Sequence, residues 1–192
     1  ASELFGLIDV LLNADAITWD EYTELEEKIY EATGHYTAGD ITAGEALEIA
    51  AELREAVLPI KDGAYQLASA RDLKTFSLLT NTTGSASKAV LAADIDMSGT
   101  LDFVPIGTSE KPFTGEFDGQ GHCITGFNME GASGNGQGLF GFTNGATIQN
   151  FSISGSIDYY GGTGVGVVGW SQAGTTIRNV HSQLNINVIE VS

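Results

Sequence analysis

Three aspartates in the second half of the chain have a spacing that could serve cation binding or acid–base chemistry. Asp94 and Asp96 lie two residues apart in KAVLAADIDM, so on a β-strand both would point to the same face. With Asp118 on a neighbouring strand, their oxygens would suit a hard cation such as calcium. The alternative is that these are strand-end acids that face solvent or cap turns, and the spacing favours that alternative.

The stretch FTGEFDGQGHCITGF contains a second set of reactive side chains. Asp118 and His122 are four residues apart, and a sharp turn could pair them as an acid and a base. The pattern favours an Asx-type turn, in which the Asp118 carboxylate accepts backbone amides and the glycines supply the bend. We expect the flanking apolar residues, Phe113, Phe117, Ile124 and Phe127, to fill the core below this corner, and Cys123 to be an inert thiol.

Aromatic side chains flank the glycine-rich segment GGTGVG. Tyr159 and Tyr160 precede it and Trp170 follows it. Exposed aromatic rings of this kind stack on sugars, so the three residues form a candidate glycan platform. In the alternative interpretation Trp170 fills the interior and the tyrosines pack a loop. We place the aromatic residues nearer the N-terminus, Trp19, Tyr22 and Tyr30, in a helical core.

The elements that position these residues begin with helices. Apolar residues recur at helical spacing through residues 1–60, which predicts a three-helix bundle. Thr18 and Thr42 each begin a capping box, Gly34 is the expected end of the second helix, and Pro59 follows the third. A fourth amphipathic helix is expected to start at Ser69.

From Lys88 onward the apolar period changes to two, and a repeat emerges. GLFGFTNGATIQNFSISGSI aligns with GVVGWSQAGTTIRNVHSQLNI, which matches Ile148 to Ile177 and Asn150 to Asn179. A weaker third copy aligns Ile124 with Ile148. Short strands and glycine corners at this period predict a solenoid of parallel strands, with a β-sandwich as the alternative fold.

The sequence therefore predicts an α+β chain of two domains. Residues 1–60 form the helical bundle, and residues 61–192 form a right-handed parallel β-helix whose first coil is capped by the helix at 69–80. INVIEVS ends within a strand pattern, so we expect either that a partner covers the last coil or, preferably, that further coils or domains follow.

Charge and cysteine content exclude several classes of function. The net charge is −17, and residues 1–62 alone contribute −12 from 15 acids and 3 bases. Such a field repels phosphate, which argues against nucleic acid as a partner. No apolar run is long enough to span a bilayer, and a single cysteine allows no intrachain disulfide.

The motifs FTGEFDGQGHCITGF, GLFG and TIQNFSISG resemble the GLUG-type repeat of bacterial surface proteins, which also occurs near the N-terminus of immunoglobulin-A-cleaving metallopeptidases. This resemblance covers about residues 63–189 and implies a parallel β-helix on an exported protein. It implies no protease activity, because the chain contains no HExxH motif. The helical segment is similar in rhythm to FIVAR-type modules of cell-wall proteins.

From these features we expect a non-catalytic, adhesin-like module, extracellular or on the bacterial cell surface, that binds a glycan or a host protein through the β-helix face. The alternatives are a fragment of a β-helix polysaccharide lyase or glycoside hydrolase centred on Asp94, Asp96 and Asp118, and a structural stalk. We expect no cofactor, with calcium as the cation that the acidic trio would take. No lysine or arginine adjoins that trio in the sequence.

Overall fold

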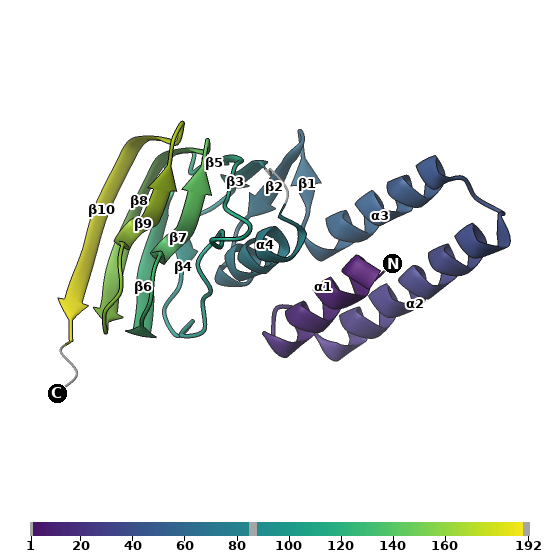
Figure 1. Ribbon diagram of the computed structural model, residues 1–192, viewed down its shortest axis with the longest axis horizontal. Helices are drawn as coiled ribbons and strands as arrows, with labels where there is room; N and C mark the ends of the chain where they lie inside the picture. The colour runs from purple at the N-terminus through teal and green to yellow at the C-terminus, as the bar shows by residue number, and fades with distance from the viewer. Residues whose placement is uncertain (1, 85–87, 190–192) are drawn as a thin grey trace. The chain divides into compact units, whose positions relative to one another are not determined.

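The computed structural model describes residues 2–84 and 88–189, without the side chains of Glu3 and Arg54 (Figure 1). The chain divides into two compact units, Ala1–Ile60 and Lys61–Ser192. Each unit is described separately below.

The first unit is helical, with α1 (Ser2–Asn13), α2 (Trp19–Ala38) and α3 (Ala43–Val57). The Thr18 capping box is confirmed, since Glu21 N donates to Thr18 Oγ1 at 3.2 Å and Thr18 N donates to Glu21 Oε2 at 2.7 Å. Thr42 and Glu45 form the same arrangement before α3. The expected end at Gly34 is wrong: α2 continues to Ala38, and Gly39 (φ 79°) is the left-handed cap. A single glycine within a strong helical pattern weakens the helix without ending it.

The core of the first unit includes Leu25 and Ile29 of α2, which are buried. Placing Trp19 and Tyr30 in this core was wrong, since the two side chains are 67% and 62% exposed. Trp19 stacks on Tyr22 at 5.3 Å between ring centroids, so the two rings shield one another on the helix surface. Exposed aromatic residues of this kind follow from a helix that has only one buried stripe.

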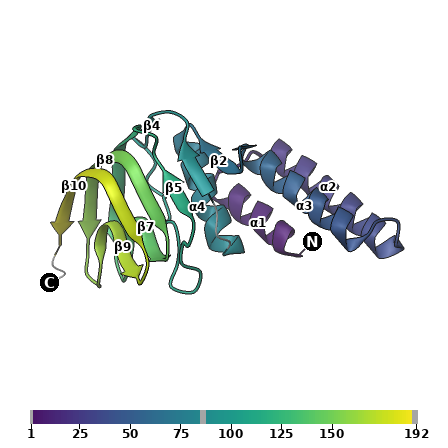
Figure 2. The same cartoon turned by 90° about the horizontal axis from the view of Figure 1, so that it is seen from above.

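The second unit is a parallel β-solenoid of about three turns, which confirms the predicted β-helix architecture over the β-sandwich (Figures 1 and 2). Helix α4 (Ala70–Thr83) lies between the second and third strands in the sequence. The strands are β1 (Ile60–Lys61), β2 (Ala64–Leu67), β3 (Lys88–Leu91), β4 (Ile95–Asp96), β5 (Glu116–Asp118), β6 (Cys123–Ala132), β7 (Gln137–Asn144), β8 (Thr147–Tyr159), β9 (Val165–Gln172) and β10 (Thr176–Val188).

The strands form three faces around a common core. The first sheet joins β2, β3, β5 and the starts of β8 and β10. The second sheet joins β4, β6 and the remainder of β8 and β10. The third sheet pairs β7 with β9. Every one of these pairings is parallel, so equivalent positions of successive turns stack directly on one another.

The core consists of columns of apolar side chains that follow this register. In the first sheet Ala89 aligns with Phe117, Phe117 with Ile148, and Ile148 with Ile177. Phe117 also packs edge-to-face on Phe140 of the third sheet, at 5.2 Å between ring centroids. The four predicted core residues are confirmed, since each is fully buried: Phe113, Phe117, Ile124 and Phe127.

The register confirms the match of Ile148 with Ile177 but not the alignment of the third copy. Ile124 pairs with Ile153, and Phe117 pairs with Ile148. The predicted match of Ile124 with Ile148 was therefore wrong. The earlier turn has extra residues in the corner after Asp118, so an alignment without a gap at this corner matches the wrong residues.

The corner between the first and second sheets is built from residues with positive φ. Asn150 (φ 61°) and Asn179 (φ 52°) occupy it in successive turns, and Asn179 Nδ2 donates to Asn150 Oδ1 at 3.0 Å. Asparagine tolerates this left-handed conformation better than most residues. At the same corner of the earlier turn lies Gly119, where a Cβ would come within 2.2 Å of Phe151 Cβ.

Helix α4 connects β2 with β3 and is buried along Leu73–Thr80. Phe76 contacts Tyr65 and Phe113 at ring-centroid distances of 5.8 and 6.0 Å, so one side of the helix packs on the solenoid core. Its polar groups hold the loop before β5: Lys74 Nζ lies 2.5 Å from Asp102 Oδ2, and Asn81 accepts from Gly107 N at 2.7 Å. The helix therefore covers the first turn of the solenoid, as its apolar stripe predicts.

Candidate functional site

Asp94 holds the corner before β6. Its Oδ1 lies 3.0 Å from His122 Nδ1 and accepts from Cys123 N at 3.0 Å. The hydrogen bond from the Cys123 amide is the main reason that the pKa of Asp94 lies below its usual value, and the hydrogen bond with His122 adds to the effect. Burial and the nearby Asp94 carboxylate raise the pKa of the Cys123 thiol. A thiol with a raised pKa is a poor nucleophile, which agrees with its expected inertness.

The other two aspartates serve separate turns. Asp96 Oδ1 accepts from Ser98 N at 2.9 Å. Asp118 Oδ1 accepts from Gln120 N at 2.8 Å, which is the predicted Asx turn. Within residues 2–84 and 88–189, no group of three or more His, Cys, Asp or Glu side chains could hold a metal ion. Asp94, Asp96 and Asp118 are therefore not brought together as a calcium site.

The aromatic candidates are also separated. Tyr159 is only 6% exposed and donates its hydroxyl to Gly134 O at 3.2 Å, so it is a filler of the core and unavailable to a sugar. Tyr160 and Trp170 are 43% and 44% exposed. Trp170 lies on β9 in register with Phe142 of β7, and their ring centroids are 6.4 Å apart. This pair gives the third sheet an accessible aromatic surface.

The parallel register assembles a cluster on the outer face of the first sheet that sequence inspection missed. We call Lys88, Glu116, Asp118, Gln149 and Arg178 the polar strip. They come from β3, β5, β8 and β10, and are scattered along the chain. The strand register could have revealed them. Each residue of the polar strip lies next in sequence to a residue of one core column, and neighbouring residues of a strand face opposite sides of the sheet. The core column is Ala89, Phe117, Ile148 and Ile177.

Gln149 is the centre of the polar strip. Its Nε2 donates to Glu116 Oε1 at 3.1 Å and to Asp118 Oδ2 at 3.0 Å, while Arg178 Nε donates to its Oε1 at 2.5 Å. Lys88 Nζ lies 3.2 Å from Glu116 Oε2. Glu116 and Asp118 thus share one amide donor, with Lys88 beside Glu116 and Arg178 on the opposite side of Gln149.

The oxygens of both carboxylates already have partners. Asp118 Oδ1 accepts from Gln120 N and from Asn150 Nδ2, and its Oδ2 accepts from Gln149. Glu116 has Gln149 on one oxygen and Lys88 near the other. These contacts fix both carboxylates in position on the outer face of the first sheet.

A polar groove adjoins the strip on the outer side of β1, β2, β3 and β5. Its volume is about 300 Å³. The lining combines the ammonium groups of two lysines with the carboxylates of two aspartates, and groups of both kinds bind sugar hydroxyls. It is formed by Lys61, Asp62, Ala64, Gln66, Lys88, Val90, Asp118 and Gln120.

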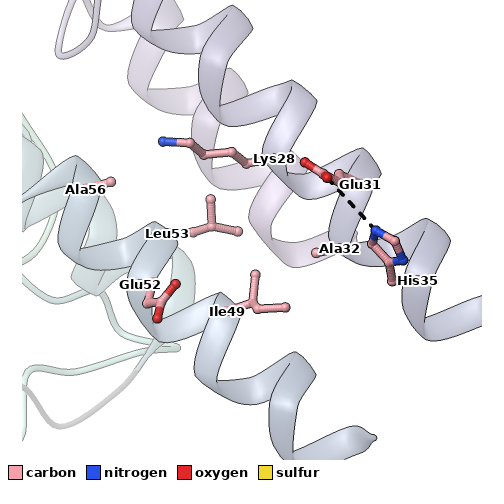
Figure 3. A pocket seen from close by; sticks show the side chains of 8 residues that line it. All are labelled: Lys28, Glu31, Ala32, His35, Ile49, Glu52, Leu53 and Ala56. Atoms are coloured by element: carbon pink, nitrogen blue, oxygen red, sulfur yellow. Dashed lines mark ion pairs between the residues drawn. The ribbon is translucent and has the colours of Figure 1, made fainter. Parts of the chain in front are cut away.

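The first unit contains a separate hollow of about 350 Å³ between α2 and α3 (Figure 3). Ala32, Ile49 and Leu53 form its apolar floor, and its rim carries charged groups such as Lys28 and Glu52. The small side chain of Ala32 leaves space between the two helices. His35 and Glu31 also line this hollow, 3.9 Å apart, and both side chains are largely exposed (Figure 3).

No family model and no solved structure matches this chain. The chain is similar to halomucin of Haloquadratum walsbyi (strain DSM 16790 / HBSQ001), with 31% identity over 136 residues. The similarity covers 62% of this chain but 1% of halomucin, so the chain spans only a very small part of that relative. None of the helices in residues 2–84 and 88–189 combines the length and apolarity needed to cross a membrane.

Proposed function

We propose that this chain is a non-catalytic module of an exported surface protein, and that its solenoid binds a glycan in the groove beside the polar strip. The supporting observation is the groove of about 300 Å³ on the outer face of the first sheet. Lys61 and Lys88 present ammonium donors on a scaffold of paired strands, which holds them in fixed positions. The similarity to a protein named halomucin supports a surface location, and the GLUG-type resemblance supports the same assignment.

A glycan array that includes neutral and acidic polysaccharides tests this proposal. We expect the intact chain to bind at least one glycan, and Lys61→Ala in the groove to lower its affinity about tenfold, the effect of removing one hydrogen bond to a charged group. Trp170→Ala is the matched control on the third sheet. Loss of binding in Trp170→Ala alone would move the glycan site to Phe142 and Trp170. Binding to no glycan would favour a structural stalk.

The second candidate is a β-helix lyase or hydrolase, because the register places Glu116 and Asp118 on the same glutamine and Lys88 beside Glu116. Product release from acidic polysaccharides, with and without calcium, distinguishes it from a binding module. If the chain is an enzyme, Glu116→Gln should lower turnover by at least about 100-fold with an unchanged melting temperature. Binding without any product release contradicts this candidate.

A further inference from the structure

The last turn of the solenoid exposes side chains of the core type. Ile177, Ile186 and Val188 of β10 are 48%, 41% and 71% exposed. Their register partners on β8, which are Ile148, Ile157 and Tyr159, are all buried. Within residues 2–84 and 88–189, these apolar residues occupy core positions that no further turn covers, at the edge of the stack where Figure 1 shows β10. An apolar surface of this kind marks an interaction site.

The backbone of β10 is open along the same edge. Strand β10 pairs with β8 through one side, and in residues 2–84 and 88–189 no strand pairs with its other side. The open strand is 13 residues long. A long edge of unpaired amide and carbonyl groups next to exposed apolar side chains favours the addition of another strand.

The charge of this turn favours a second copy of the chain as the occupant. Residues 165–188 contain Arg178 and His181 but no aspartate or glutamate, although the whole chain has 25 acids. Two copies can therefore meet through residues 165–188 without burying a carboxylate from this segment. The first turn is unsuited to receive β10, because α4 covers it and its edge strand β1 has only two residues.

We propose that two copies associate tail to tail, with β10 of one copy antiparallel to β10 of the other about a two-fold axis at Leu184. In this register Val180 lies opposite Val188, Ser182 opposite Ile186, and Leu184 opposite itself. Opposite residues of an antiparallel pair share a face, so the core-facing positions of one copy meet those of the other. The outward residues, His181 with Asn187 and Gln183 with Asn185, also meet one another.

Sedimentation equilibrium of the intact chain over a wide concentration range tests the association. We expect a reversible dimer. Ile186→Glu should weaken it by at least about tenfold, because each dimer would bury two carboxylates. Asn185→Glu adds the same charge to the outward face of the same strand and should dimerise like the wild type. Equal weakening by both substitutions overturns the proposal. A wild type that stays monomeric also overturns it, and would indicate that the exposed face of β10 binds a different protein.

Oxidative cross-linking in a Cys123→Ser background tests the register. Leu184→Cys should form a covalent dimer under mild oxidation, because the axis places position 184 opposite itself. Val180→Cys is the control: its two copies would lie about 27 Å apart along the strands, at about 3.4 Å per residue, and should not cross-link. Efficient cross-linking of Val180→Cys with none of Leu184→Cys would exclude this axis. Far-ultraviolet circular dichroism confirms that each variant is folded.

Discussion

Asn150 combines an unusual backbone conformation with a column of side-chain hydrogen bonds. It has a φ of 61°, donates to Asp118 Oδ1 at 3.1 Å and accepts from Asn179 Nδ2 at 3.0 Å. We expect Asn150→Ala to lower the free energy of unfolding by about 2–3 kcal/mol, from left-handed strain and lost hydrogen bonds. Asn150→Gly loses only the hydrogen bonds and should cost about 1 kcal/mol. Urea denaturation measures both, and equal costs would contradict a role for the backbone conformation.

Two glycines separate the effect of conformation from the effect of close approach. Gly155 (φ 151°) leaves no room for a Cβ, which would lie 1.9 Å from Phe127 O, whereas Gly145 (φ 67°) has nothing within 4 Å. We expect Gly145→Ala to cost about 1–2 kcal/mol from strain alone. Gly155→Ala should cost clearly more, because the paired strands β6 and β8 must separate. Thermal unfolding of the two variants compares them, and a smaller cost for Gly155→Ala would contradict this account.

At the level of single residues, the sequence predicted local backbone conformation better than it predicted contacts between residues far apart in the chain. The Asx turn of Asp118 could be predicted because the turn depends on neighbours within a few positions. Tyr159 was misplaced because its burial depends on strand register, which sets whether a position faces the core. The polar strip could not be predicted because Glu116 and Gln149 meet only when successive turns of the solenoid align.

Helix α4 is the element that ties the first turn to the loop before β5, and Asp102 is part of this connection. The ion pair with Lys74 is the main reason that the pKa of Asp102 is lowered. A lowered pKa in the folded state means that the pair stabilises the protein above the usual carboxyl pKa, and that this contribution is lost as the pH falls through the lowered value.

We therefore expect Asp102→Asn to lower the free energy of unfolding at neutral pH, and to have a smaller effect in acid below the usual aspartate pKa of about 3.9. Urea denaturation at the two pH values measures the difference. Glu130→Gln on β6 is the control at an exposed acid. A penalty for Asp102→Asn that does not change with pH would show that the ion pair has no part in the effect.

At the level of elements, local signals predicted the starts of helices well. Thr18, Thr42 and Ser69 each cap the helix that follows, because capping involves only the first turn. The end of α2 was missed because Gly34 and Gly39 are both acceptable stops, and the sequence alone does not decide which one adopts positive φ. The third copy of the repeat was misaligned because its corner differs in length.

For the whole molecule, the net charge of −17 sets how the proposed dimer should respond to salt. Repulsion between two acidic chains opposes association, while the contacts of β10 are apolar or between backbone groups. Added sodium chloride screens the repulsion and should strengthen the dimer. Sedimentation equilibrium at low and high salt measures this change, and dissociation by salt would indicate that charged pairs hold the copies together.

The register of the solenoid has a consequence for its evolution and engineering. Asn179 follows its column partner Asn150 by 29 residues, and the other partners of β8 and β10 keep this offset. Duplication of one such block would extend the rod by a single strand spacing, roughly 4.8 Å, without altering its cross-section. Adding or removing such blocks would therefore change the length of the solenoid in equal steps of one strand spacing.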